Sequence, residues 1–139
     1  MNDTTKKYRQ QFKDILMNQL SEPEKEGWYY EKYGDEWAVV HYDGGVIHRY
    51  DGPAVITRSF RVYFFWKGKV HRISGPAIIL PDGEQHYYQN DVLHRIDGPA
   101  LVKPHGKSEW WVCGVRCNPH NFNKAKERYL SNKNVIGRT

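Results

Sequence analysis

The sequence has few of the residues on which disulfide-stapled proteins and helix bundles depend. Only two cysteines occur among 139 residues, and a chain of this length does not need a disulfide in order to fold. Leucine is scarce, whereas Tyr, Phe and Trp make up 14% of the chain. A core built from aromatic rings and β-branched residues favours a β-sheet over a helix bundle.

Long apolar segments are also lacking. No run approaches the roughly 18 apolar residues that a membrane-spanning helix needs, and the start MNDTTKKYRQQ has no apolar core of a secretory signal. We therefore expect a cytoplasmic protein with no membrane contact beyond a peripheral one. The net charge of +5 permits binding to nucleic acid, anionic lipid or acidic protein, but it does not select among them.

The sequence lacks the motifs of the common enzyme classes. It has no Gly-rich phosphate loop, no G-x-S-x-G and no H-E-x-x-H, so we expect no enzyme, no catalytic residue and no cofactor. Cys113, Cys117 and His120 form a C-x3-C-x2-H pattern, but a zinc site usually has four ligands and more closely spaced cysteines. We interpret both cysteines as reduced thiols and expect no metal.

What the sequence does contain is an internal repeat. The string His-Arg-x-x-Gly-Pro-Ala begins at His48, His71 and His94, at a constant spacing of 23 residues. A fixed period of this length is typical of a repeat architecture. In a diverged fourth copy, Cys117 and Asn118 replace the His-Arg pair. We therefore interpret the cysteines as substitutions within a diverged repeat.

Two neighbouring columns of the repeat are aromatic. One column holds Tyr42, Phe65, Tyr88 and Trp111, and its neighbour holds His41, Phe64, Tyr87 and Trp110. Each unit is interpreted as an aromatic strand, such as 63–66, and an aliphatic strand, such as 77–80. Turns such as Pro81-Asp82-Gly83 and Lys67-Gly68 join them, and connections this short force antiparallel neighbours.

These patterns predict a mainly β protein. The expected fold is an antiparallel meander of 23-residue β-hairpin repeats in a single curved sheet, with an α-helix at each end. The segments are an amphipathic helix over 1–22, capped by Asp3-Thr4-Thr5, the repeat sheet over 28–117, a helix over 118–131 that starts at Pro119, and a flexible tail over 132–139. The apolar side of the first helix comprises Tyr8, Phe12, Ile15, Leu16 and Leu20. The helices cap the sheet ends or cover one face.

The unit resembles the MORN repeat (membrane occupation and recognition nexus). The resemblance lies in Trp66-Lys67-Gly68-Lys69-Val70-His71, then Gly75, then Asp82-Gly83 and Tyr87, and it covers about 36–116. It implies a single-layer antiparallel sheet with a scaffolding or partner-binding role, and lipid binding in some members. The chain departs from that family in having Arg rather than Gly after each His. This His-Arg-x-x-Gly-Pro-Ala variant is similar to repeats in phage and bacterial proteins, which suggests a phage protein that modulates a host factor.

The His-Arg pairs are the sharpest candidate binding residues: His48, Arg49, His71, Arg72, His94 and Arg95. Equivalent positions two strands apart lie roughly 9.6 Å from one another, and a row of guanidinium groups can clamp phosphates or carboxylates. The alternative is that each pair forms a structural corner, with Arg bonded to Asp51 or Asp97 or stacked on a ring. Ser74 offers no such carboxylate in the middle unit.

The aromatic column Tyr42, Phe65, Tyr88 and Trp111 is the second candidate. Either it packs in a core, or it forms an exposed interface of the kind that Tyr and Trp often anchor. The basic residues of the C-terminal segment are interpreted as a solvated helix face rather than a nucleic-acid arm: Lys124, Lys126, Arg128, Lys133 and Arg138.

The sequence thus predicts a non-enzymatic binding or adaptor protein that acts by protein–protein interaction. The alternative is an anion-binding module that recognises nucleic acid, a nucleotide or a phosphoinositide through the repeated Arg and His. Association of copies through sheet edges is a further expectation.

Overall fold

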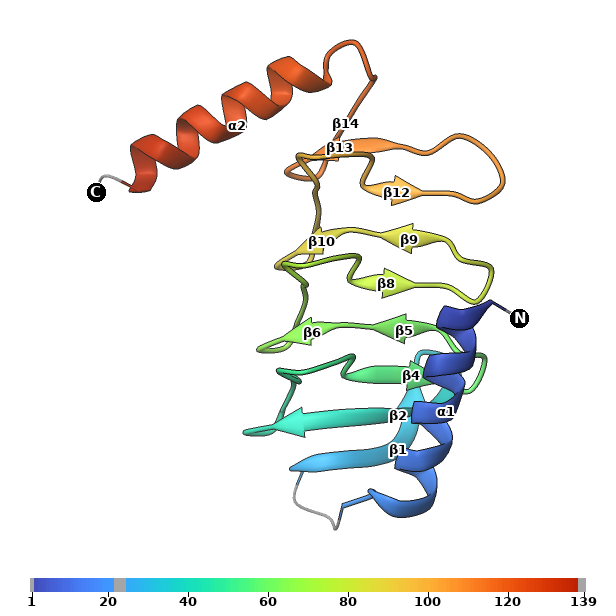
Figure 1. The fold of residues 1–139 in the computed structure, drawn as a ribbon. Coiled ribbons are helices and arrows are strands. Elements are labelled where there is room, and N and C mark those ends of the chain that lie inside the picture. Colours follow the sequence, from blue (N-terminus) through green and yellow to red (C-terminus); the bar gives the residue numbers. More distant parts are fainter. Residues whose placement is uncertain (1, 22–24, 138–139) are drawn as a thin grey trace.

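The computed structural model describes residues 2–21 and 25–137, with side chains up to 133, and it is mainly β (Figure 1). Helix α1 (Asp3–Asn18) precedes the strands and helix α2 (Phe122–Gly137) follows them. The strands are β1 (Gly27–Tyr33), β2 (Glu36–Asp43), β3 (Val46–Ile47), β4 (Val55–Thr57), β5 (Val62–Tyr63), β6 (Phe65–Trp66), β7 (Lys69–Val70), β8 (Ile78–Ile79), β9 (Gln85–His86), β10 (Tyr88–Gln89), β11 (Val92–Leu93), β12 (Leu101–Val102), β13 (Trp110–Val112) and β14 (Val115–Cys117). The expected antiparallel hairpin repeats with one helix at each end are confirmed.

The main sheet grows along the chain in the order β1-β2-β4-β5-β8-β9-β12, with β3 paired to β2 (Figure 1). All of its ladders are antiparallel. The hairpins β6–β7, β10–β11 and β13–β14 form separate two-stranded ladders. Each repeat therefore contributes strands to the shared sheet and a small hairpin beside it.

The aromatic strand of each unit changes its hydrogen-bond partner midway. The amide of Phe64 donates to the carbonyl of Ala77, on the side of the main sheet, at 2.7 Å. The carbonyl of Phe64 accepts from the amide of His71, on the side of its own hairpin, at 3.1 Å. The corresponding residues His41 and Tyr87 make the same pair of bonds one unit away. Before this residue the strand is hydrogen-bonded to the main sheet, and after it the strand is hydrogen-bonded within its own hairpin. The hairpins therefore form ladders separate from the main sheet.

Two-residue turns with positive φ close the hairpins. Lys67 and Gly68 have φ of 48° and 83°, and Asn90 and Asp91 have φ of 49° and 67°. Positive φ at both central residues matches the twist of a hairpin. The turn predicted at Lys67-Gly68 is confirmed, and the turn at Asn90-Asp91 repeats it one period later.

Helix α1 lies across one face of the sheet, over β2 and β4 (Figure 1). Its buried residues Tyr8, Phe12 and Ile15 join a cluster with apolar residues of that face: Trp28, Val39, Ile56, Val62, Phe64, Ala77 and Ile79. The opposite face has a second cluster of Ala38, Val40, Ala54, Val55 and Phe65, against which further rings pack. The single layer is thus apolar on both sides, and α1 covers one of them.

The ends of α1 differ from the sequence prediction. The cap is Asn2, whose Oδ1 accepts a hydrogen bond from the Thr5 amide at 2.7 Å, rather than Asp3-Thr4-Thr5. The helix ends at Asn18, so Leu20 lies outside it and is 44% exposed. Leu20 forms a β-bridge with Trp28 instead. Residue 22, the predicted end of this helix, lies outside the described residues.

Helix α2 is shifted toward the C-terminus relative to the expected 118–131. The side chain of Asn118 accepts a hydrogen bond from the Asn121 amide at 2.9 Å, which holds 119–121 in a turn. The helix therefore begins at Phe122 and not at Pro119. Residues 132–137, expected to be a loose tail, belong to α2, and 138–139 lie outside the described residues. None of the described helices combines the length and apolar character needed to cross a bilayer.

Candidate binding site at the repeated corners

The Gly-Pro bend of every unit is bonded to the arginine that precedes it. The guanidinium Nη1 donates to the proline carbonyl at 3.1 Å in all three units: Arg49 to Pro53, Arg72 to Pro76 and Arg95 to Pro99. The corner is therefore a closed loop within one unit. The bond to the proline carbonyl was not among the contacts expected of a structural corner, which were an ion pair with Asp51 or Asp97 or stacking on a ring.

The glycine of each corner leaves room for this arginine. A Cβ at Gly98 would lie 2.8 Å from Cζ of Arg95, and one at Gly75 would lie 3.0 Å from Nη1 of Arg72. These glycines do not have positive φ, so close approach rather than backbone conformation calls for glycine here.

Each guanidinium also packs against an aromatic ring. Cζ of Arg72 lies 3.9 Å from the centroid of Phe64, and Cζ of Arg95 lies 3.9 Å from that of Tyr87. In the first unit Arg49 lies 5.0 Å from the centroid of Trp28. A cation over a ring face is attracted by the ring quadrupole, so Phe64 and Tyr87 of the second aromatic column stabilise two of the arginines, and Trp28 of β1 stabilises Arg49.

The histidines join each corner to the next hairpin. Nδ1 accepts a hydrogen bond from a backbone amide in every unit: His48 from Lys67 at 2.8 Å, His71 from Asn90 at 3.0 Å and His94 from Cys113 at 2.9 Å. An accepting Nδ1 carries no proton, so the ring proton sits on Nε2 and the ring is neutral. Each repeated histidine therefore accepts a hydrogen bond from the first residue of the next hairpin turn.

The three histidines differ in what covers them. His48 is 2% exposed under the rings of Tyr50 and Trp66, and its Nε2 has no hydrogen-bond partner among the described residues. His94 is 5% exposed beneath Tyr129 of α2, with ring centroids 4.5 Å apart. Burial, and secondly the charge of Lys133, lower the pKa of His94. The middle residue, His71, is only half-buried.

Two grooves follow the repeat. Groove 1, of about 550 Å³, is lined by 49–53, 64–66 and 71–74 together with Lys7, Tyr8 and Gln11 of α1. Groove 2, of about 380 Å³, is lined by 72–75, 87–89 and 94–97 together with Tyr129 and Lys133 of α2. The corner and strand residues of the two grooves are related by the 23-residue period, so the same concavity is built twice.

The arginines in these grooves are not equally paired. Nε of Arg49 lies 3.1 Å from Asp51, and Nε of Arg95 lies 2.9 Å from Asp97. The middle unit has Ser74 at that position, and no carboxylate among the described residues pairs with Arg72. Arg72 lines both grooves.

Exposed apolar side chains stand at the rim of the grooves. Tyr50 is 73% exposed and Ile73 is 85% exposed, and both occupy the position directly after the His-Arg pair. Ile96, at the same position in the third unit, is half-buried. These residues were not predicted from the sequence as binding residues, although an apolar or aromatic residue recurs at this position of the loop motif.

The first aromatic column does not share one environment. Tyr42 and Phe65 belong to the cluster on the face opposite α1, whereas Tyr88 packs against the cluster beneath α1. The indole of Trp111 donates to Glu109 at 3.1 Å. Of these four, only Phe65 and Tyr88 line a groove.

Neither cysteine lines groove 1 or groove 2. Cys113 is exposed in a turn, and the thiol of Cys117, whose pKa is raised by burial, donates to the Trp110 carbonyl at 3.6 Å. Within the part of the chain that the structure describes, no three His, Cys, Asp or Glu side chains gather as a metal site requires. Lys133 alone of the predicted basic set lines a corner groove, and Arg138 lies outside the described residues.

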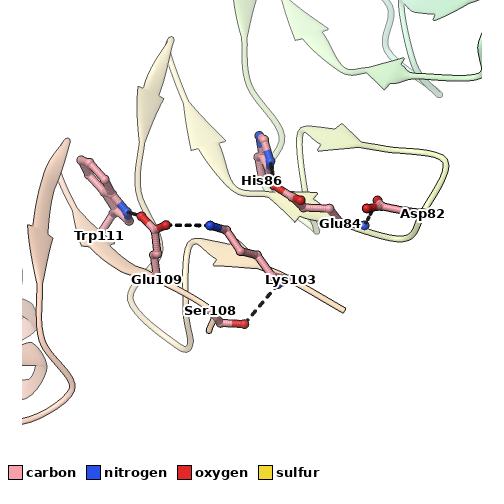
Figure 2. Close-up of polar contacts among 7 residues, drawn as sticks. All are labelled: Asp82, Glu84, His86, Lys103, Ser108, Glu109 and Trp111. Atoms are coloured by element: carbon pink, nitrogen blue, oxygen red, sulfur yellow. Dashed lines mark hydrogen bonds and ion pairs between the residues drawn. The ribbon is translucent and has the colours of Figure 1, made fainter. Parts of the chain in front are cut away.

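A second polar cluster lies at the turns between β8 and β9 and beyond β12 (Figure 2). Glu109 bonds Nζ of Lys103 at 2.9 Å as well as the Trp111 indole, and these contacts lower the pKa of its carboxyl. His86 bonds Glu84 at 2.8 Å. These contacts join charged side chains within one unit or to the next strand, so the cluster stabilises the turns.

In comparisons with known proteins, no family model, no curated protein and no solved structure matches the chain.

Proposed function

We propose that this protein is a non-enzymatic binding scaffold that holds another polypeptide along its repeated corners. The observation that carries the proposal is the duplication of one groove at the repeat period, with exposed Tyr50 and Ile73 beside it. A pair of equivalent sites suits a ligand that is itself linear and periodic. Large exposed apolar side chains are typical anchors of protein interfaces.

The spacing of the grooves favours an extended chain. Equivalent points on units two strands apart are separated by roughly 9.6 Å, and three residues of a polyproline II helix span roughly 9.3 Å. Side chains three residues apart on one extended peptide can therefore enter groove 1 and groove 2 in turn.

A displayed library of random peptides, each long enough to cross both grooves, tests the proposal. The library is selected on the immobilised wild-type protein, and the enriched peptides are then measured against a double variant, Tyr50→Ser with Ile73→Ser. We expect the variant to bind them at least about tenfold more weakly, because burial of an apolar anchor contributes a factor of this order.

The matched control removes apolar side chains outside the corners. Val46 and Val115, which are 46% and 67% exposed at hairpin ends, are both changed to Ser. This control should bind as the wild type does, and circular dichroism should show both variants folded. If no peptide is enriched, or if the two double variants behave alike, the proposal fails.

A further inference from the structure

We propose that the peptide held in these grooves is acidic. Two of its carboxylate side chains, three residues apart, enter groove 1 and groove 2, and one of them is bound by Arg72. This inference rests on the proposed binding of a polypeptide and specifies the chemistry of that partner.

The chain itself shows which anion a corner arginine takes. In the first and third units, an aspartate oxygen lies at Nε of Arg49 and of Arg95, at 3.1 Å and 2.9 Å. The middle corner keeps every other part: Nη1 of Arg72 bonds Pro76, and the guanidinium lies on Phe64. Only the carboxylate is missing, because Ser74 stands in its place. The Nε edge of Arg72 is therefore oriented for a carboxylate that the middle unit does not supply.

The orientation of Arg72 is fixed before any ligand arrives. The Pro76 bond and the ring of Phe64 hold the guanidinium at two points. A preorganised planar fork loses little freedom when it binds a carboxylate. His71 also lines groove 1 and carries its proton on Nε2, because Nδ1 accepts from Asn90, and this gives a second donor beside Arg72.

The charge of both grooves favours an anion. Groove 1 contains Lys7, Arg49 and Arg72 with one carboxylate, Asp51, which is already paired. Groove 2 contains Arg72, Arg95 and Lys133, also with one paired carboxylate. Each groove thus has a surplus of positive charge, and Arg72 contributes to both.

A carboxylate peptide fits these features better than a nucleic acid does. The internal ligands of the equivalent arginines are carboxylates, and the rim side chains Tyr50 and Ile73 are apolar. Acidic residues at every third position of an extended peptide would all lie on one side of it, since a polyproline II helix has three residues per turn.

The test uses two fluorescent peptides, four repeats of Glu-Pro-Pro and four repeats of Gln-Pro-Pro, measured by anisotropy with the full chain. We expect the Glu peptide to bind at least about tenfold more tightly than the Gln peptide, as for the loss of a charge-assisted hydrogen bond. Its affinity should fall as salt is raised.

The decisive variant is Ser74→Asp. It restores the sequence of the other two corners, so it should fold at least as well as the wild type, and its carboxylate should occupy Nε of Arg72. We expect it to weaken binding of the Glu peptide by about tenfold. The converse variant, Asp51→Ser, frees Arg49 in groove 1 and should bind the Glu peptide more tightly than the wild type does.

Three results would overturn the inference. Ser74→Asp could bind the Glu peptide as tightly as the wild type. The wild type could fail to bind the Glu peptide while library-selected peptides still depend on Tyr50 and Ile73, which would leave the proposed function intact. A single-stranded oligonucleotide could bind more tightly than the Glu peptide and lose that binding in Ser74→Asp, which would identify phosphate as the ligand.

Discussion

At the scale of single residues, the corner of each unit depends on a close contact between an arginine and a glycine. The guanidinium occupies the space that a Cβ at the glycine would need, and its bond to the proline carbonyl closes the loop. The corner thus requires glycine and arginine together. The pair recurs in all three units because the same close contact recurs in each.

This pairing predicts a coupled effect of two substitutions. Gly98→Ala should destabilise the protein by about 1–3 kcal/mol, because the new methyl group would displace the guanidinium of Arg95. In an Arg95→Ala background the same change should cost much less, since the space is then free. A double-mutant cycle of urea unfolding measures the difference. Equal costs in the two backgrounds would show that Gly98 is required for another reason.

At the scale of elements, the two helices protect opposite ends of the repeat in different ways. Helix α1 lies across one face of the sheet (Figure 1). Helix α2 contacts the last units through rings, with Phe122 against Trp110 and Tyr129 against His94. Trp110 holds the column position that Phe64 and Tyr87 hold in units with an arginine. Phe122 thus covers the ring that has no arginine to cover it.

The contact between α2 and His94 predicts a pH dependence. Burial and Lys133 lower the pKa of His94 below its ordinary value of 6.5, so the unfolded chain takes up this proton more readily than the folded one. The stability that the neutral ring contributes is therefore complete above pH 6.5 and is lost as the pH falls through the lowered pKa.

Urea unfolding of the wild type and of His94→Asn, measured between about pH 8 and pH 5, tests this dependence. The Asn side chain does not titrate, and its carbonyl can still accept from the Cys113 amide. The variant should lose less stability on acidification than the wild type does. Parallel losses in the two proteins would assign the pH dependence to other groups.

At the scale of the whole molecule, the repeats form a nearly one-dimensional array. Most backbone bonds between units join strands that follow each other along the chain, and the same bonds recur at the repeat period. Arrays of this kind are stabilised by each unit and by its interfaces with the neighbouring units. A whole unit should therefore be removable while the register of the remainder is kept.

Deletion of 72–94 removes one period and joins His71 to Arg95. We expect a folded, mainly β protein with a urea m value lower by roughly one sixth, in proportion to the surface lost. Only one of the two grooves would remain. Deletion of 72–91, which is not a whole unit, serves as the control and should not fold. A shortened chain that loses its β spectrum in the first case would contradict the array.

The sequence predicted which corner residues belong to the candidate site, but not which residues of the helices surround them. The three arginines were recognised because their motif recurs, and the contact that each makes lies within its own unit. Lys7 and Lys133 were not recognised as groove residues, because they come from the helices and reach the grooves only when these helices dock. The sequence likewise did not show that Ile73 is exposed whereas Ile96 is half-buried, although both directly follow a His-Arg pair.

The sequence alone determined the period, the antiparallel hairpins and the two-residue turns, because all of these depend on interactions between residues close along the chain. It also determined that Ser74 breaks the Arg-Asp pattern of the corners. The tertiary structure decided where each aromatic strand changes partner, which face α1 covers, and that Arg72 lines both grooves. Those features depend on the packing of segments far apart in the sequence, which no single repeat unit contains.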